Sequence, residues 1–335
     1  MSSSVPPSDE RSAAAIGSCW VLTDGKAGTE NQCIGLAEAL GLDPLVKRLK
    51  PQAPWRWPPA SLWPRLPPKL VLGLVTQAGD PLGPPWPRLL IASGKPSVGP
   101  ALAVRRLANR QTFAVQVQDP RVDPRLFDLV AAPHHDHLHG ANVIQTLGAL
   151  HRVTPERLEE ARARFAPEFA ALPRPLVAVL IGGTSNSYQM TREAARDLAG
   201  GLRQMCEASG AGLLITVSRR TGANNEKVLR NALAGLPAAF WDGDGNNPYL
   251  GYLALADAIV VTEDSVSMTS EAVSTGKPVH VAGLPGGSAK FREFHGTLRA
   301  SGATRPFAGA LETWSYEPVH DTELVAAEVA RRLRG

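Results

Sequence analysis

Cysteine is scarce in this sequence: the 335 residues include only Cys19, Cys33 and Cys206. This odd and scattered set excludes a disulfide scaffold and a zinc cage built from CxxC pairs, and it favours a reducing, cytoplasmic compartment. No run of about 18 apolar residues without charge is present, so no transmembrane helix is expected. The N-terminus carries Asp9 and Glu10 before any apolar stretch, a pattern that does not fit a secretory signal peptide.

A strong excess of one sign of charge is also missing. The chain has 35 Lys and Arg against 31 Asp and Glu, which gives a net charge of +4. Because this excess is small and spread out, no nucleic-acid partner is expected, whereas anionic substrates or an anionic membrane surface are compatible with it. Apolar residues make up 44% of the chain, enough for folded cores, and the length is typical of two domains.

What the sequence does contain is a regular alternation of short apolar runs and helical patterns. Runs of about four to six apolar residues are each followed by Gly, Ser, Asp or His and then by a helix, which is typical of parallel strands. We therefore predict an α/β fold of two Rossmann-like, doubly wound domains that face each other across a cleft. The predicted division is a disordered N-terminus at 1–15, a first domain at 16–152, a linker helix at 153–175, a second domain at 176–320 and a C-terminal helix at 321–335.

Residues 51–87 interrupt this alternation. They hold 11 of the 29 prolines and four of the seven tryptophans, namely Trp55, Trp57, Trp63 and Trp86. Proline at this density predicts an extended, irregular excursion over the first domain, although the run KLVLGLV fits either a helix or a strand. Tryptophan favours membrane interfaces and arginine favours anionic lipids, so the segment is compatible with a membrane contact; packing of the tryptophans on their own domain is the alternative.

Two local signals place helices in the first domain. Thr29 and Gln32 have the S/T-x-x-E/Q spacing of a capping box, and the helix they predict ends at Gly41. Pro100 is predicted to open a second helix, with the sequence ALAVRRLANR.

Two polar loops that follow strands of the second domain carry residue types that bind phosphate. In IGGTSN, Gly182 and Gly183 would let the backbone approach a ligand closely, and the hydroxyl and amide groups beside them would hold phosphate. The motif is neither GxGxxG nor GxxxxGK[ST], so dinucleotide and Walker-type sites are not favoured. Arg219 and Arg220 follow the next strand and suit a diphosphate. A plain tight turn and a solvated arginine pair are the alternatives.

Two further loops of the second domain precede helices. The stretch EDSVSMTSE places hydroxyls and carboxylates at a helix start, where amide groups bind phosphate, and Glu271 could accept hydrogen bonds from a ribose diol. Simple N-capping by Ser265 or Ser267 is the alternative. In PGGSAK, Lys290 lies near a helix start, which the helix dipole disfavours unless an anion binds there.

In the first domain, polar residues cluster where predicted strands end, at the edge that faces the cleft in α/β folds. Three carboxylates there could act as a general base, and turn stabilisation is the alternative for each: Asp24, Glu30 and Asp119. The histidine-rich loop at 134–139 has no fixed helical spacing and no second ligand segment, so no metal site is expected, and His135 is expected to line the cleft.

Several long motifs together resemble one family. They are WVLTDGKAGTENQCIGLAEALG, ASGKPSVGPAL, VQDPR, IGGTSNSY, SRRTGANNE, TEDSVSMTSEAVSTGKPV and PGGSAKFREFH. Over roughly residues 17–320 the chain is similar to the elongated-mitochondria fission-factor family, whose plant members are named for organelle division and whose bacterial relatives are regarded as glycosyltransferases. The Arg- and Ala-rich composition indicates a bacterial member.

The second half also resembles, more distantly, the nucleotide-sugar domain of the GT-B glycosyltransferase that forms lipid II. That family has a Gly-Gly-Ser-like loop, matched by Ile181–Ser185, a Ser-Glu pair on the donor ribose, matched by Ser270 and Glu271, and a later sugar-contacting loop, matched by Pro285–Lys290. The first domain departs from that enzyme, because Asp24-Gly25-Lys26 replaces its Gly-rich acceptor loop.

These resemblances imply a GT-B-like, metal-independent glycosyltransferase with a nucleotide-sugar donor, no cofactor and an envelope glycolipid acceptor such as a lipopolysaccharide core. The protein would be cytoplasmic and peripheral on the inner membrane. A non-catalytic scaffold in membrane remodelling and a nucleotide-sugar epimerase are the alternatives.

The expected site residues fall into three groups. Asp24 is the favoured base, followed by Glu30 and Asp119. The acceptor side comprises Gly25, Lys26, Ser93, Gly94, Lys95, Gln118 and His135. The donor side comprises Gly182, Gly183, Thr184, Ser185, Asn186, Ser218, Arg219, Arg220, Glu263, Asp264, Ser265, Ser267, Met268, Ser270, Glu271, Gly286, Gly287, Ser288 and Lys290.

Overall fold

The computed structural model describes residues 17–50, 59–76 and 80–334. It divides into two compact units, which are described separately: unit 1 is Met1–Arg152 with His320–Gly335, and unit 2 is Val153–Val319. The disorder predicted for 1–15 lies outside the described residues, as do Trp55 and Trp57. Within the described part of the chain, no helix has the length and apolar character needed to span a bilayer.

Unit 1 is a six-stranded parallel sheet with helices on both faces. Its strands, in the sheet order β2-β1-β3-β4-β5-β6, are Leu45–Arg48, Cys19–Thr23, Leu89–Ser93, Phe113–Val117, Leu129–Pro133 and Val143–Thr146. Its helices are α2 (Ala27–Ala39), α3 (Pro68–Thr76), α4 (Lys95–Leu107) and α11 (Asp321–Arg334), with short 3₁₀ helices η1 (Ala60–Arg65), η2 (Pro124–Leu126) and η3 (His134–Asp136).

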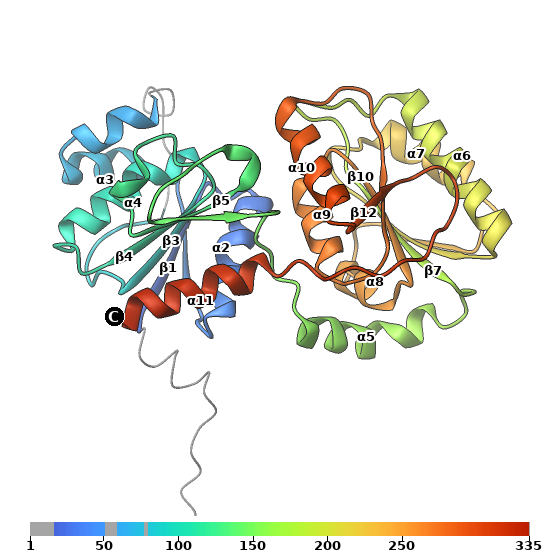
Figure 1. The fold of residues 1–335 in the computed structure, drawn as a ribbon, viewed down its shortest axis with the longest axis horizontal. Helices are drawn as coiled ribbons and strands as arrows, with labels where there is room; N and C mark the ends of the chain where they lie inside the picture. The colour runs from blue at the N-terminus through green and yellow to red at the C-terminus, as the bar shows by residue number, and fades with distance from the viewer. Residues whose placement is uncertain (1–16, 51–58, 77–79, 335) are drawn as a thin grey trace, which may run out of the picture. The chain divides into compact units, whose positions relative to one another are not determined.

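Side-chain alternation along β1 divides the core of unit 1 into two layers. Trp20 and Leu22 pack with residues of α3 and α4, whereas Cys19 and Val21 pack with residues of α2 and α11. Figure 1 shows these helices beside the sheet of unit 1. Because both faces are covered, the strands are apolar on both sides, which explains their nearly unbroken apolar runs.

Unit 2 repeats this architecture. Its strands, in the sheet order β12-β11-β10-β7-β8-β9, are Thr304–Pro306, Val279–Ala282, Ala258–Thr262, Leu176–Ile181, Gly212–Val217 and Ala238–Phe240. Its helices are α5 (Pro155–Phe169), α6 (Arg192–Ser209), α7 (Ala223–Ala232), α8 (Tyr249–Leu255), α9 (Val266–Val273) and α10 (Ala289–Ala300). Strand order reverses between β7 and β10, the point where doubly wound sheets bind ligands. The predicted α/β class with two Rossmann-like units is confirmed.

The irregular excursion predicted at 51–87 is wrong between residues 60 and 76, whereas residues 80–87 form neither helix nor strand, as predicted. Residues 60–65 and 68–76 are helical, so the undecided run KLVLGLV belongs to a helix. Trp63 is buried against α4, and Trp86 packs edge-on against Trp20 with ring centroids 6.1 Å apart. Packing of these two tryptophans against unit 1 compensates for the hydrogen bonds that proline removes.

The two helix starts predicted in unit 1 also need correction. Helix α4 begins at Lys95, five residues before Pro100, because the Ser97 hydroxyl donates to the carbonyls of Ser93 and Gly94 and ties the first turn to the strand end. Helix α2 has no capping box: the Thr29 hydroxyl donates to Asp24 Oδ1 at 2.9 Å, so it is used as a donor and not as the acceptor that a cap requires.

Candidate functional site

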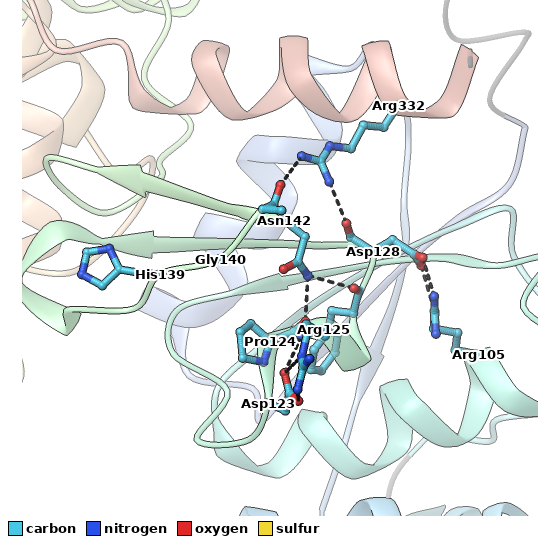
Figure 2. A pocket seen from close by; sticks show the side chains of 11 residues that line it. Arg105, Asp123, Pro124, Arg125, Asp128, His139, Gly140, Asn142 and Arg332 are labelled. Atoms are coloured by element: carbon cyan, nitrogen blue, oxygen red, sulfur yellow. Dashed lines mark hydrogen bonds and ion pairs between the residues drawn. The ribbon is translucent and has the colours of Figure 1, made fainter.

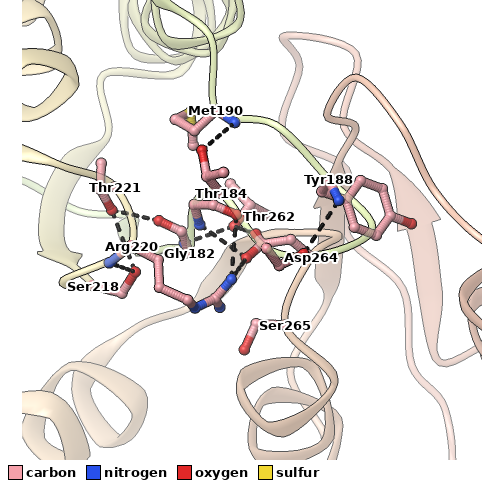
Figure 3. Close-up of polar contacts among 12 residues, drawn as sticks. Gly182, Thr184, Tyr188, Met190, Ser218, Arg220, Thr221, Thr262, Asp264 and Ser265 are labelled. Atoms are coloured by element: carbon pink, nitrogen blue, oxygen red, sulfur yellow. Dashed lines mark hydrogen bonds and ion pairs between the residues drawn. The ribbon is translucent and has the colours of Figure 1, made fainter.

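One buried carboxylate joins three loops at the carboxyl ends of β7, β8 and β10 (Figure 3). The Asp264 side chain is 0% exposed, accepts the Gly183 amide at 2.8 Å and the Thr262 hydroxyl at 2.7 Å, and pairs with the Arg220 guanidinium. The Thr262 hydroxyl in turn accepts the Gly182 amide at 2.7 Å. This Asp264 node therefore fixes the loop geometry at the strand-order reversal.

The two glycines of the β7 loop are required by this packing. A Cβ added at Gly182 would lie 2.2 Å from Asp264 Oδ1, and one at Gly183 would lie 2.1 Å from the carbonyl carbon of Arg220. The space beside both glycines is filled by the chain itself, which corrects the prediction that they admit a ligand. The predicted contact between Asp264 and the donor is corrected as well, because this carboxylate is fully buried and holds the loops in position.

Hydroxyl groups in the same loops hold the backbone. The Thr184 hydroxyl accepts the Met190 amide at 3.1 Å, the Ser185 hydroxyl accepts the Tyr188 amide at 3.2 Å, and the Ser218 hydroxyl accepts the Arg220 amide at 3.2 Å. Thr184, Asn186 and Arg219 are exposed, so these three present their side chains at the surface of the site.

Helix α9 begins beside the Asp264 node. Ser265 caps it by accepting the Met268 amide at 3.3 Å, and Ser267 is half-buried. Ser270 is buried and its hydroxyl donates to the Val266 carbonyl at 2.8 Å, so the prediction that Ser270 holds phosphate at the helix start is wrong for this arrangement. Half-buried Glu263 accepts the Leu284 amide at 2.8 Å and so anchors the next loop.

Glu271 lies on α9, and its carboxylate Oε2 accepts the hydroxyl of Tyr249, the first residue of α8. Burial raises the pKa of Glu271 to about 7, against the opposing effect of the Tyr249 hydrogen bond. Burial and the nearby carboxylate raise the pKa of Tyr249 well above its ordinary value, so Tyr249 remains the donor. Glu271 is half-buried, and in the part of the chain that the structure describes its hydrogen bond to another side chain is the one from Tyr249 to Oε2.

The loop before α10 is joined to the β7 loop. Gly286 has φ of +118°, and a Cβ there would lie 2.4 Å from the Ser187 carbonyl oxygen. The Gly287 amide donates to that oxygen at 2.6 Å. Ser288 caps α10 by accepting the Phe291 amide, and Lys290 is exposed in the first turn.

In unit 1, the three candidate bases all lie in ion pairs. Asp24 pairs with Lys26 at 2.6 Å, and Glu30 pairs with Arg48 at 2.7 Å. Asp119 pairs with Arg121 at 3.0 Å. Burial raises the pKa of Asp24, but hydrogen bonds from Lys26 and Thr29 outweigh it and lower the pKa overall.

The acceptor-side residues separate into surface and core positions. Lys26 and Lys95 are exposed, and Gly25 and Gly94 turn the chain at φ of +78° and +82°. Ser93 and His135 were expected to face the acceptor, and this expectation is corrected. Ser93 is 0% exposed as the last residue of β3, and His135 is buried. Gln118 donates to Gln32 Oε1 at 3.3 Å. In the described residues, no three His, Cys, Asp or Glu side chains are grouped to hold a metal ion.

A cavity of about 550 Å³ lies at the opposite, amino-terminal edge of the unit 1 sheet (Figure 2). Arg105 pairs with Asp128, Arg125 pairs with Asp123, and Arg332 donates to the Asp128 carbonyl at 3.2 Å. Because each of these arginines is already engaged, the ion pairs and hydrogen bonds among the lining residues hold the walls of the cavity together.

Several residues of the unit 2 site escaped sequence reasoning. Thr262 and Thr221 are buried threonines at loop ends, and the Thr221 hydroxyl donates to the Gly182 carbonyl. Tyr188 pairs with Gly286 in an isolated bridge, and Tyr249 holds Glu271. In the sequence, these four residues are marked only by their position next to a strand end or a glycine pair. Many residues with a purely structural role lie in such positions, so the sequence alone did not single them out.

Comparisons with known proteins agree with this architecture. The family model "Mitochondrial fission ELM1" matches residues 27–333. The mitochondrial fission protein ELM1 of Arabidopsis thaliana is 32% identical, with 93% of this chain and 90% of that protein covered.

Solved structures show the same fold at low sequence identity. UDP-GlcNAc 2-epimerase from Methanocaldococcus jannaschii matches with a TM-score of 0.57 at 11% identity, over 95% of this chain and 99% of that one. The same enzyme in complex with UDP-GlcNAc and UDP matches with a TM-score of 0.53 at 10% identity, over 93% and 99%. With the family match extending over most of its length, this chain belongs to the mitochondrial fission ELM1 family.

Proposed function

We propose that this protein is a glycosyltransferase whose nucleotide-sugar donor binds to unit 2 at the strand-order reversal. The observation that carries the proposal is the Asp264 node. Its fully buried carboxylate holds three loops together at the position where doubly wound sheets bind ligands. A neighbour of the same fold is described in complex with UDP-GlcNAc and UDP, which supports this ligand class.

The proposed donor contacts follow from the exposed groups. Arg219 and the outer side of Arg220, which is 39% exposed, would hold the diphosphate together with the amides at the start of α9. Glu271 would accept the ribose hydroxyls on Oε1 while Tyr249 holds Oε2. Lys290 lies at the start of α10, where a sugar or phosphate group would reach it. These groups would stabilise the leaving diphosphate, so the proposal requires no metal and no cofactor.

The acceptor is assigned to unit 1, with Asp24 as the proposed base and Glu30 and Asp119 as alternatives. The lowered pKa of Asp24 keeps its carboxylate ionised at neutral pH, the state that accepts a proton, although a low pKa also limits its strength as a base. A cell-envelope glycolipid is the proposed acceptor, and attachment at an anionic inner-membrane surface accords with the net charge of +4.

A second candidate, a nucleotide-sugar epimerase, is favoured by the solved structures of that activity that share the fold. Epimerisation needs an acid and a base on opposite faces of one sugar carbon. A transferase needs one base and an acceptor. The two activities are therefore separated by whether turnover depends on an added acceptor.

Binding is tested first, by titration calorimetry of the whole protein with UDP, GDP, ADP, dTDP and CMP. We expect one nucleoside diphosphate to bind, and we expect Arg219→Ala and Glu271→Gln each to weaken it about tenfold, or about 1.4 kcal/mol. Arg125→Ala, which changes an exposed arginine of unit 1, is the matched control and should bind normally. Unchanged affinity in both unit 2 variants would refute the donor map.

Turnover is then followed by NMR of the matching nucleotide sugar. Release of the nucleoside diphosphate that requires a lipopolysaccharide-core acceptor supports the transferase. Conversion of the sugar without an acceptor assigns the epimerase instead. If the protein binds none of the nucleotides, both the transferase and the epimerase proposals are refuted. The non-catalytic scaffold suggested by the family's name would then take their place.

A further inference from the structure

The small net charge of the chain results from an uneven distribution of charge along the sequence. Residues 44–118 contain 11 Lys and Arg but a single carboxylate, Asp80, so this segment carries a charge of +10. The remaining residues contain 24 Lys and Arg against 30 Asp and Glu and carry a charge of −6. The expectation that the positive excess is spread out is therefore wrong, because the excess belongs to one segment of unit 1.

Several cations of this segment have no carboxylate beside them. Arg65, Lys69 and Arg106 are exposed, and among the residues that the structure describes none of the three forms an ion pair with Asp or Glu, whereas the neighbouring Arg105 pairs with Asp128. The one carboxylate of the segment is engaged at the end of β2, where Asp80 accepts the Arg48 amide at 2.7 Å. Their positive charge is therefore presented to the solvent.

Two exposed leucines lie on the outside of η1 and α3. Leu62 in η1 is 42% exposed and Leu70 in α3 is 46% exposed, whereas most large apolar side chains of unit 1 are buried. The opposite side of α3 carries Val71 and Leu72, which are buried in the core layer shared with α4 (Figure 1). A Cβ added at Gly73, three residues after Leu70, would meet nothing within 4 Å, so this side of α3 is open.

The three cations lie beside these leucines. Lys69 precedes one leucine in the first turn of α3, and Arg65 lies one 3₁₀ turn after the other, so their side chains are on the same side of η1. The Arg106 guanidinium, near the end of α4, donates to the carbonyls of Pro64 and Leu66 and so reaches the turn between η1 and α3. We call these five side chains the α3 surface: Leu62, Arg65, Lys69, Leu70 and Arg106.

The packing of η1 keeps this surface facing outward. Trp63 is buried and lies against Gly99 of α4, which anchors η1 on unit 1 and leaves the neighbouring leucine exposed. Exposed leucines beside cations that no carboxylate neutralises are typical of helices that lie in the interface of an anionic membrane. With nine residues, α3 is too short to cross a bilayer, which needs about 20, so such a contact would lie along the membrane surface.

We propose that the α3 surface docks unit 1 on an anionic phospholipid bilayer, with its two leucines between the lipid headgroups and its three cations on the lipid phosphates. A bilayer accommodates both kinds of side chain, whereas a purely acidic partner would match the cations and leave the leucines in water. The inference rests on the proposed function in one respect, the membrane-bound acceptor, which docking would bring within reach of unit 1.

Flotation of the whole protein with vesicles tests the proposal, in the absence of acceptor and nucleotide. We expect binding to vesicles of phosphatidylcholine with phosphatidylglycerol and none to phosphatidylcholine alone. Binding should weaken when the ionic strength rises from about 0.1 M to about 1 M, because the Debye length falls to about 3 Å. Arg65→Gln/Lys69→Gln should weaken binding about 25-fold, since each cation near an anionic membrane contributes about fivefold. Leu70→Ser should weaken it about fivefold.

Two matched controls change the same residue types elsewhere. Arg192→Gln/Arg196→Gln removes the same charge from exposed positions of α6 in unit 2. Leu324→Ser replaces a leucine of α11 that is 55% exposed. Both controls should bind the vesicles like the unaltered protein, and unchanged melting temperatures verify that all variants fold.

A loss confined to the variants of the α3 surface supports the proposal. No binding to the phosphatidylglycerol vesicles, an equal loss in either control, or full binding by Leu70→Ser overturns it. Binding of polyglutamate without binding of vesicles also overturns it and assigns the surface to an acidic protein.

The nucleotide titration separates this result from the proposed function. Arg65→Gln/Lys69→Gln should keep the nucleotide affinity of the unaltered protein while it loses vesicle binding. If the unaltered protein binds the vesicles but no nucleotide, the donor map fails and the α3 surface is supported. If it binds a nucleotide but no vesicle, the docking proposal fails and the donor map is unaffected.

Discussion

At the scale of single residues, Glu271 makes stability depend on pH. In the folded protein its carboxyl holds a proton up to a pKa of about 7, whereas in the unfolded chain it ionises near 4.5. Between these values the folded state binds more protons, so this group lowers the free energy of unfolding as pH rises from 4.5 to 7 and has no further effect above. Glu271→Gln should therefore gain about 3 kcal/mol relative to the unaltered protein between pH 4 and pH 8.

Urea unfolding from pH 2 to pH 8 measures the effect, with Glu328→Gln as a control of opposite sign. Hydrogen bonds from Arg331 and Arg332 lower the pKa of Glu328 to about 2. The ionised Glu328 therefore stabilises the folded protein above pH 4.5, and this stabilisation is lost as pH falls toward 2. The Glu328 variant should be the less stable protein at pH 8, and the difference should close on acidification. A Glu271 difference that does not change with pH would contradict the assignment.

Sequence reasoning at this scale found residue types more reliably than their roles. It singled out Gly182, Gly183 and Asp264 as ligand contacts, and the structure uses them to pack one loop against another. The distinction depends on a contact between positions about 80 residues apart, which local composition does not contain. Arg219 is exposed and Glu271 bonds Tyr249 through Oε2, so for these two residues a contact with the donor stays a prediction.

At the scale of elements, two helical glycines offer a matched test of packing. A Cβ at Gly99 in α4 would lie 2.7 Å from the buried Trp63 ring, whereas one at Gly200 in α6 would meet nothing within 4 Å. Gly99→Ala should lose about 2 kcal/mol through overpacking, and Gly200→Ala should gain about 1 kcal/mol through helix propensity. Denaturant unfolding gives both values, and a gain in the Gly99 variant would show that η1 is not packed on α4 as described.

Strands were the most predictable elements, because a strand buried on both faces needs an apolar run and nothing else. Helix starts were less predictable, because they depend on which atom a side chain bonds. Thr29 carries a capping-box sequence but donates to Asp24, and Ser97 extends α4 back past Pro100. The helices at 60–65 and 68–76 form in a proline-rich segment because Trp63 anchors them in the core, a tertiary effect.

At the scale of the whole molecule, the chain returns to unit 1 after completing unit 2. Helix α11 packs on α2, and the Thr322 hydroxyl accepts the His151 amide at 3.0 Å. The helix itself was predictable from its amphipathic pattern. Its partner was not, because the contacts join positions about 170 residues apart and the helix could have packed on either unit.

Asp321, the first residue of α11, makes this return testable. Its carboxylate is buried and accepts the amides of Leu147 at 3.2 Å and Gly148 at 2.7 Å. Asp321→Ala leaves both amides without their acceptor, which should cost about 2 kcal/mol. Amide hydrogen exchange should then rise in α2 and α11 and stay unchanged in β7 and β8, because the loss falls within unit 1. Glu323→Ala, an exposed change two residues on, should affect neither. Equal acceleration of exchange in both units would mean that they unfold as one cooperative body and that α11 stabilises the molecule as a whole.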